Sequence, residues 1–168
     1  MNYEKYLNET NPKVIIDVKN YGEIEVELFP SVAPITVENF LHLVDDNFYN
    51  GLTFHRVISG FMIQGGDPLG NGTGGSKNKI KGEFEANGVK NDLAHSRGVI
   101  SMARAMNPNS ASSQFFIMHK DAPHLDGNYA AFGAVVKGID IVDKIASVRT
   151  DYYDHPLEDV IMNVKRVK

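Results

Sequence analysis

Strict alternation of apolar and charged residues near the N-terminus limits the fold more than any other feature of this chain. Ile24, Val26 and Leu28 alternate with three glutamates, so one side of this segment is apolar and the other is charged. Successive side chains of a β-strand point to opposite faces, and the pattern therefore predicts a strand with one solvent-exposed face. A similar alternation over 14–18 precedes it across a turn at 20–22, which predicts a β-hairpin.

The remaining periodic segments predict two helices and several more short strands. Pro34 suits the first turn of a helix, and apolar residues follow it at helical spacing, at Val37, Phe40, Leu41 and Val44. A shorter apolar repeat over 141–148 predicts a second helix. Further strands are expected at 52–58, 99–103, 114–118, 130–136 and 160–164. Many short strands with only two helices predict a closed β-barrel whose open ends the helices cover.

Length and composition point to one domain without nucleic-acid, thiol or membrane chemistry. We expect residues 1–12 to form an N-terminal arm and residues 13–168 a single domain, since 168 residues can bury a sizeable core. The net charge is −4 and no long basic run occurs, which argues against a nucleic-acid partner. The lack of cysteine excludes disulfides and thiolate sites. With no secretory h-region or membrane-length apolar run visible, we expect a cytoplasmic protein without a membrane partner.

The segment from Phe54 to Gln64 carries the most unusual chemistry, because Arg56 lies among apolar residues on a predicted strand. Such an arginine is commonly a surface residue whose stem packs on apolar neighbours. The alternative is a fixed cation beside an apolar pocket. A second cluster at 113–116, Ser-Gln-Phe-Phe, favours this alternative, since two strands that each offer Gln and Phe can line one concave site.

Other motifs give weaker signals. Residues 70–75 match G-x-G-x-x-G, but neither a clear strand before them nor an amphipathic helix after them completes a dinucleotide site, and Ser76 stands where a Walker A loop needs lysine. These glycines are better explained as a backbone that a peptide can approach closely. A metal site among His119, Asp121, His124 and Asp126 is conceivable, but the spacing matches no common ligand pattern. We expect no metal and no cofactor.

Ordered motifs across nearly the whole chain resemble the cyclophilin family of peptidyl-prolyl cis–trans isomerases. They are the stretches Pro34–Phe40, Phe54–Ile58, Gly60–Asp67, Asn71–Gly75, Ser101–Ala103, Ser113–Ile117, Leu125–Gly127 and Phe132–Gly133. The stretch Pro123–Gly133 is similar to bacterial members in particular. The resemblance implies a closed eight-stranded antiparallel β-barrel capped by two α-helices, with the site on its outer face. It also implies isomerisation of X–Pro bonds in polypeptides, in aid of protein folding.

The resemblance further implies a role for individual residues. Arg56 would be the catalytic cation, and the proline pocket would consist of Phe61, Met62, Phe116 and Leu125. The substrate main chain would contact Gln64 and the backbone of Arg104. A neighbouring groove for the residues before the proline would be bordered by Gly72, Thr73, Ala103, Ala105 and Gln114. We also expect substrate contacts from His55, His124 and Tyr129.

Three positions depart from the family pattern. His124 stands where eukaryotic members often have tryptophan, Tyr129 replaces a pocket histidine, and Arg104 replaces an asparagine. We expect His124 to reduce the affinity for cyclosporin without affecting catalysis, and Arg104 to have a mild effect because its position acts through the backbone. We expect a monomer. Two other hypotheses stay open from the sequence: a non-catalytic module that binds proline peptides, and a lipocalin-like carrier with a hollow interior.

Overall fold

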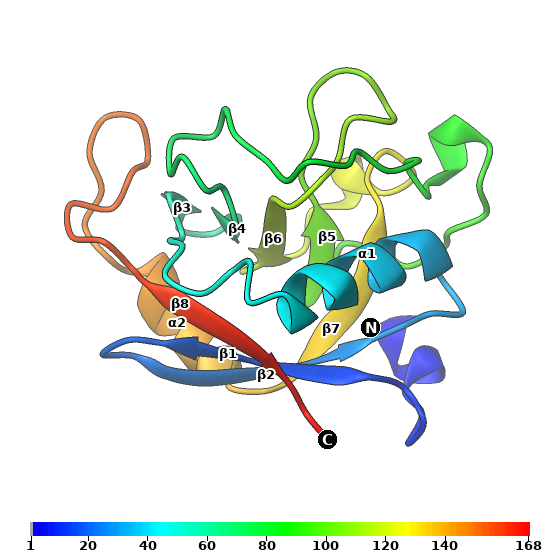
Figure 1. Ribbon diagram of the computed structural model, residues 1–168, viewed down its shortest axis with the longest axis horizontal. Coiled ribbons are helices and arrows are strands. Elements are labelled where there is room, and N and C mark those ends of the chain that lie inside the picture. The colour runs from blue at the N-terminus through cyan, green and yellow to red at the C-terminus, as the bar shows by residue number, and fades with distance from the viewer. Residues whose placement is uncertain (1) are drawn as a thin grey trace.

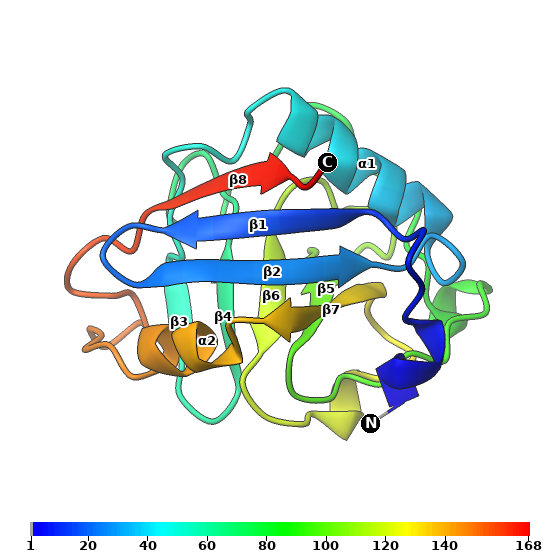
Figure 2. The ribbon, with the colours of Figure 1, turned by 90° about the horizontal axis from the view of Figure 1, so that it is seen from below.

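Eight antiparallel strands form one strongly curved sheet in the computed structural model, which describes residues 2–168 (Figure 1). The strands are β1 (Lys13–Val18), β2 (Gly22–Leu28), β3 (Arg56–Ile58), β4 (Met62–Gly65), β5 (Val99–Met102), β6 (Phe115–Met118), β7 (Ala131–Lys137) and β8 (Met162–Arg166). Their order across the sheet is β3-β4-β6-β5-β7-β2-β1-β8. The two halves of the sheet face each other, with β8, β1, β2 and β7 on one side in Figure 2 and the other four strands behind them.

Two α-helices form where the spacing of apolar residues predicts them, and they lie at opposite ends of the curved sheet. Helix α1 (Pro34–Asp45) packs near β8, and α2 (Ile139–Ala146) packs against β2, β3 and β4 (Figure 2). Short 3₁₀ turns occur at η1 (Asn2–Tyr6), η2 (Glu85–Asn87) and η3 (Pro123–Leu125). No helix among residues 2–168 has the length and apolar character needed to cross a membrane.

The sheet is an open, curled half-barrel, and the expectation of a closed barrel is therefore wrong. Within residues 2–168, β3 and β8 form the two edges of the sheet and share no ladder. The predicted strand at 52–58 is strand only from Arg56 to Ile58. Before it, the chain makes the single bridge Thr53–Ile161, and the Phe54 amide donates to the Val160 carbonyl at 2.9 Å. The chain before β3 thus approaches residues 160–162 through this bridge and neighbouring backbone hydrogen bonds, without forming a ladder.

Large side chains fill the space between the two halves of the sheet. The ring of Phe40 on α1 lies 5.2–5.6 Å from the rings of Tyr49, Phe115 and Phe132, measured between centroids. All four residues are fully buried. The buried Tyr49 hydroxyl donates a hydrogen bond to the Ser113 carbonyl at 2.8 Å, which satisfies a polar group inside the core. A filled interior rules out the hollow carrier that the sequence left open.

The predicted hairpin of β1 and β2 forms, but one of its glutamates is buried. Ile16 pairs with Ile24 and Val14 with Val26, so their side chains share the core face. Glu27, expected on the solvent-exposed face, accepts hydrogen bonds from the Asn8 amide at 2.9 Å and from Asn11 Nδ2 at 3.0 Å. The predicted N-terminal arm thus covers this end of β2. Met1, the first residue of that arm, lies outside the described residues.

Candidate functional site

Arg56 lies on the outer face of the sheet, where cross-strand pairing sets its position. It pairs with Gln64 on β4, and Gln64 in turn pairs with Phe116 on β6. Alternate residues of a strand point to opposite faces. Phe116 therefore belongs to the outer face, whereas its neighbour Phe115 packs in the core against Phe40. A shift of one residue in this register would exchange the core side chains for those of the site.

A row of amide hydrogen bonds holds the Arg56 guanidinium. Gln114 Nε2 donates to the carbonyls of Gly72 at 3.1 Å and Gly74 at 2.8 Å, which fixes the orientation of this amide. Its Oε1 then accepts from Gln64 Nε2 at 2.9 Å. Gln64 Oε1 is thereby turned toward Arg56 and accepts from its Nη1 at 3.2 Å. The guanidinium is exposed and has further N–H groups available for a ligand.

An open cavity of about 170 Å³ lies beside Arg56, and we call it the apolar cavity because six of its nine lining residues are apolar or aromatic. This space is several times the roughly 30 Å³ that a water molecule occupies in the liquid. Phe61, just before β4, and Leu125 in η3 complete its walls. The lining residues are Arg56, Phe61, Met62, Gln64, Ala103, Arg104, Phe116, Leu125 and Tyr129. A small, mostly apolar ring can enter this cavity with an attached polar atom facing the Arg56 guanidinium.

A buried histidine supports the floor of this cavity. The ring of His95 stacks on Phe116 with a centroid distance of 6.0 Å and an interplanar angle of 20°. Its Nδ1 lies 3.0 Å from the Asp126 carboxylate and its Nε2 lies 2.9 Å from the Ser101 hydroxyl. Burial lowers the pKa of His95, although the Asp126 carboxylate acts in the opposite direction. Both ring nitrogens are satisfied, so Phe116 rests on a rigid support.

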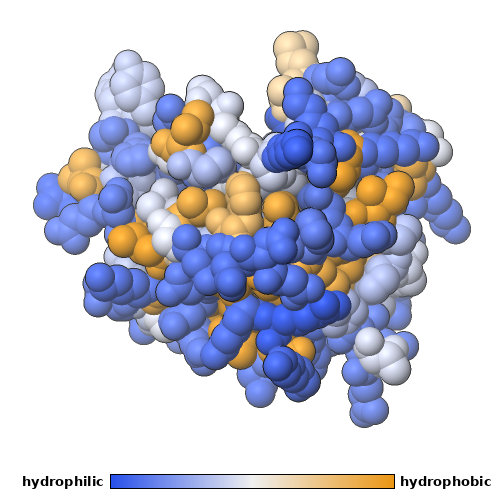
Figure 3. All heavy atoms as spheres, in the orientation of Figure 1, coloured by the Kyte–Doolittle hydropathy of each residue, from blue (hydrophilic) through white to orange (hydrophobic). Residues whose placement is uncertain are grey.

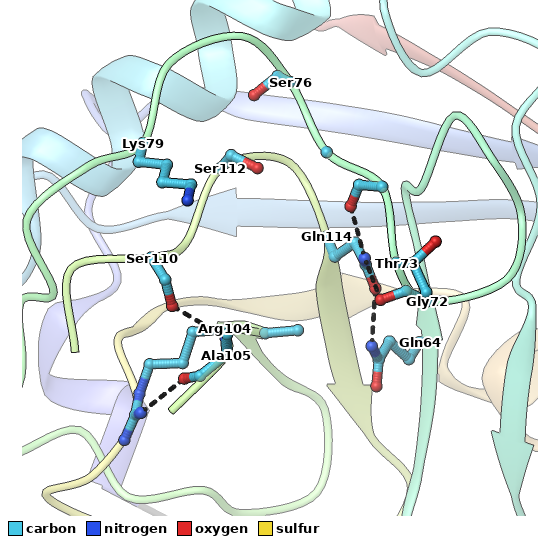
Figure 4. A pocket seen from close by; sticks show the side chains of 13 residues that line it. Gln64, Gly72, Thr73, Ser76, Lys79, Arg104, Ala105, Ser110, Ser112 and Gln114 are labelled. Atoms are coloured by element: carbon cyan, nitrogen blue, oxygen red, sulfur yellow. Dashed lines mark hydrogen bonds between the residues drawn. The ribbon is translucent and has the colours of Figure 1, made fainter. Parts of the chain in front are cut away.

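A second cavity of about 300 Å³ adjoins the first and shares Gln64, Ala103 and Arg104 with it (Figure 4). It lies between the glycine-rich loop and the segment that precedes β6. Its lining is more polar than that of the first cavity and includes several hydroxyl groups. The other lining residues are Gly72, Thr73, Gly74, Gly75, Ser76, Lys79, Ala105, Ser110, Ser112 and Gln114.

Asp67 shapes the glycine-rich loop from within. Its carboxylate accepts hydrogen bonds from the backbone amides of Leu69, Asn71, Gly72 and Gly74, at 2.6–3.2 Å. Burial alone would raise the pKa of Asp67, but these backbone hydrogen bonds outweigh it and hold the pKa below its ordinary value. A Cβ on Gly74 would lie 2.2 Å from Asp67 Oδ1, so only glycine fits there. The loop therefore forms one wall of the second cavity, and its shape is set by hydrogen bonds to the Asp67 carboxylate.

Arg104 forms the wall between the two cavities. Its guanidinium carbon lies 4.8 Å from the ring centroid of Phe84 and 4.7 Å from that of Tyr129. The same guanidinium donates to the carbonyls of Asn128, Ala105 and Met106 at 2.7–3.2 Å. Both aromatic contacts are within the range of cation–π attraction. Arg104 thus fastens the backbone of 104–106 to the segment at 128–129.

The structure gathers all but two of the predicted site residues around the two cavities. His55 is the first exception, since it is only 5% exposed and lines neither cavity. Its ring nitrogens have no hydrogen-bond partner among residues 2–168, and burial lowers its pKa. His124 is the second exception. It is exposed at the rim, with its ring centroid 5.9 Å from that of Phe61.

Several residues that build the site had no distinct signal in the sequence. His95 and Phe84 act through contacts with residues far along the chain, which a local pattern does not reveal. Lys79 lies in a polar segment whose sequence predicts only a loop. Each of these three residues supports or lines a cavity, and only the tertiary fold brings it there. Asp67 is different, because it ends the motif Gly60–Asp67 and its partners are only two to seven residues away.

The histidines considered for a metal site have other contacts. His119 Nδ1 accepts from the Gly60 amide at 2.9 Å, and its Nε2 lies 3.1 Å from the Asp143 carboxylate. Asp143 also receives two hydrogen bonds from Arg97. No group of three or more potential ligands suited to a metal ion occurs among residues 2–168. The network instead holds Gly60, which precedes Phe61 at the mouth of the apolar cavity.

Comparisons with known proteins agree with this geometry. The family model "Cyclophilin type peptidyl-prolyl cis-trans isomerase/CLD" matches residues 13–167. A peptidyl-prolyl cis-trans isomerase of Acinetobacter baylyi is 48% identical over 143 residues, which cover 80% of this chain and 72% of that protein. The peptidyl-prolyl cis-trans isomerase-like 2 protein of Rhizopus delemar is 42% identical over 94% of this chain, which spans only 29% of that protein.

Solved structures extend the similarity to the fold. The crystal structure of a cyclophilin type peptidyl-prolyl cis-trans isomerase of Cryptosporidium parvum superposes with a TM-score of 0.86 at 33% identity, covering 94% of this chain and 98% of that one. A second crystal structure of the same protein, in the presence of the dipeptide Ala-Pro, gives a TM-score of 0.85 and 34% identity, covering 93% and 99%.

Proposed function

We propose that this chain, which belongs to the cyclophilin-type peptidyl-prolyl cis–trans isomerase family, accelerates rotation about X–Pro bonds by means of Arg56 and the apolar cavity beside it. The observation that carries the proposal is the juxtaposition of a hydrogen-bonded guanidinium and a cavity lined by Phe61, Met62 and Phe116. The substrate class is polypeptides with exposed X–Pro bonds, and the cellular role is assistance to protein folding.

The chemistry needs a donor and not a nucleophile. An X–Pro amide is planar because the nitrogen lone pair is delocalised, and rotation faces a barrier of about 18–20 kcal/mol. In the twisted transition state the lone pair localises on nitrogen. A donor aimed at that nitrogen stabilises the transition state more than the planar ground state, which is the requirement for catalysis. Arg56 fits this role because a guanidinium stays charged and rigid.

Arg56 alone is too weak to account for the full acceleration. A hydrogen bond to a charged group contributes roughly 1.5–3 kcal/mol. Reduction of an isomerisation time from tens of seconds to milliseconds needs about four decades, or roughly 5–6 kcal/mol. We assign the remainder to the cavity, which holds the prolyl ring while the preceding carbonyl rotates. An apolar site also favours the twisted amide, which is less polar than the planar one.

The second candidate function, a non-catalytic proline-peptide module, would use the same cavity without acceleration. An NMR exchange measurement on an Ala-Pro peptide separates the two. We expect wild-type protein at a few per cent of the peptide concentration to raise the cis–trans exchange rate far above the uncatalysed rate, which corresponds to tens to hundreds of seconds. Shifted peptide resonances without faster exchange would identify a binding module and contradict the proposal.

The rim of the site supports a proposal about cyclosporin. His124 lies beside Phe61 in place of a larger indole, and Tyr129 lines the apolar cavity. We therefore expect cyclosporin to bind, but with reduced affinity. His124→Trp is expected to tighten binding by adding apolar contact area at the rim. Isothermal titration calorimetry of both proteins tests this, and an unchanged dissociation constant would mean that His124 is not what limits affinity.

Residues 13–168 are proposed to be a single isomerase domain that acts as a monomer in the cytoplasm. The face of the molecule in Figure 3 is mainly hydrophilic with smaller apolar patches, and this supports a monomer. Light scattering of the purified chain tests the oligomeric state, and a mass of twice 18.6 kDa would contradict it. Fractionation of the source cells tests the location, and recovery outside the cytosol would contradict it.

A further inference from the structure

We propose that the second cavity selects an acidic side chain two or three residues before the proline, and that Lys79 is the residue that determines this specificity. The inference rests on the proposed function and extends it to the sequence context of the substrate. It concerns residues on the glycine-rich side of the site, opposite the apolar cavity across Arg104.

The charge of the second cavity is entirely positive. Lys79 and Arg104 are the two charged residues that line it, and no carboxylate does. Arg104 directs its guanidinium to backbone carbonyls and to two aromatic rings, away from the centre of the cavity in Figure 4. Four hydrogen bonds thus engage the Arg104 guanidinium, and the cation that points into the cavity is Lys79.

Lys79 is placed to meet such a ligand. Its side chain is exposed, and within residues 2–168 it forms no hydrogen bond or ion pair. In Figure 4 its ammonium group points into the cavity, toward the side where Ser110 and Ser112 lie. By contrast, Lys5 is paired with Asp92 at 2.8 Å. A cation without a partner at the wall of a concave site attracts an anionic group.

Hydroxyl groups also line the second cavity, but they are not all open to a ligand. Ser76 Oγ has no hydrogen-bond partner among the described residues, yet it is shielded from solvent. The Ser110 hydroxyl already donates to the Asn107 carbonyl at 2.6 Å. Lys79 is therefore the group that a carboxylate entering the cavity meets.

The length of an extended peptide determines which substrate residue before the proline can reach the second cavity. The two cavities meet at Gln64, Ala103 and Arg104, so a peptide with its proline in the apolar cavity must pass this wall. An extended chain advances about 3.3–3.6 Å per residue. The residue directly before the proline belongs to the rotating bond. The next two residues are the ones whose side chains can reach the second cavity.

The expected preference is modest, because Lys79 is exposed to solvent. An exposed ion pair changes an equilibrium by roughly 1.5- to 5-fold, and salt screens it. A glutamate peptide should therefore be isomerised with a kcat/KM about 2- to 5-fold above that of the matched glutamine peptide at low ionic strength. At about 1 M salt, where the screening length is only about 3 Å, the ratio should approach one.

The test uses paired peptides that carry Glu or Gln at each of the three positions before proline. Wild-type protein, Lys79→Gln and Lys79→Glu are compared by kcat/KM at low and high salt. Lys77→Glu serves as the matched control, because Lys77 is exposed on the same loop but lines neither cavity. We expect the Glu/Gln ratio to fall to about one in Lys79→Gln, to fall below one in Lys79→Glu, and to keep its wild-type value in Lys77→Glu.

The outcomes separate the two proposals. Equal rates for the Glu and Gln peptides with wild-type protein would overturn the selection of an acidic residue while leaving isomerisation intact. An equal fall of the ratio in Lys77→Glu and Lys79→Glu would overturn the specific role of Lys79, because it would reflect only the overall charge of the loop. No acceleration of the Gln peptide at all would instead overturn the proposed isomerase function.

Discussion

At the scale of single residues, the side chains of Arg104 and Tyr129 are in contact, with the guanidinium carbon 4.7 Å from the ring centroid. Both residues lie at positions where the sequence predicts a difference from the family pattern. Phe84 covers the other contact face of Arg104. From the sequence we expect Arg104 to act through its backbone, but the structure gives its side chain contacts as well. Its side chain fastens the wall that divides the two cavities, and Tyr129 provides part of the surface to which it is fastened.

A double-mutant cycle tests this pairing. We expect Arg104→Ala and Tyr129→Leu each to reduce the free energy of unfolding and to raise KM for a tetrapeptide. Their effects should be non-additive by roughly 0.5–2 kcal/mol, the range of a cation–π contact. Urea denaturation and steady-state kinetics provide both readouts. Arg166→Ala combined with Tyr129→Leu is the control and should be additive. Additivity in the Arg104 cycle as well would mean that the two side chains act independently.

At the level of elements, the site depends on strands and a loop that are held by different forces. The alternation along β3, β4 and β6 places Arg56, Gln64 and Phe116 on one face through backbone pairing. The glycine-rich loop has no such ladder. It is held by the carboxylate of Asp67, which accepts hydrogen bonds from four backbone amides. The loop should thus be more sensitive to charge and pH than the strands.

Asp67→Asn tests this dependence. Because the pKa of Asp67 is lowered in the folded state, its ionised form stabilises the fold above the ordinary pKa of about 3.8–3.9, and this stabilisation is lost as pH falls through the lowered value. We expect the substitution to cost about 2–3 kcal/mol at pH 7 and less at pH 3, as measured by urea denaturation. Asp17→Asn, at an exposed position, is the control. An equal cost at both pH values would contradict the role of the charge.

At the scale of the whole molecule, periodic and local features could be predicted from the sequence. The hairpin over 14–28 and both helices were predictable because burial repeats at the period of the element. The candidate site residues were predicted because they lie in ordered motifs, and most of them line the two cavities. The open edge between β3 and β8 was not predictable, since it depends on how far two distant strands pair. The roles of His95 and Phe84 likewise arise only from long-range packing.

The central claim is that Arg56 stabilises the twisted prolyl amide beside a cavity that holds the ring. The most direct measurement is NMR exchange on an Ala-Pro peptide with wild-type protein, Arg56→Ala and Arg56→Lys, after spectra confirm that each variant is folded. Loss of a charged hydrogen bond of about 1.5–3 kcal/mol predicts a rate roughly 10- to 150-fold lower for Arg56→Ala. Arg56→Lys should be intermediate, since it keeps the charge without the planar fork. An exchange rate near that of the wild type in folded Arg56→Ala would contradict the account.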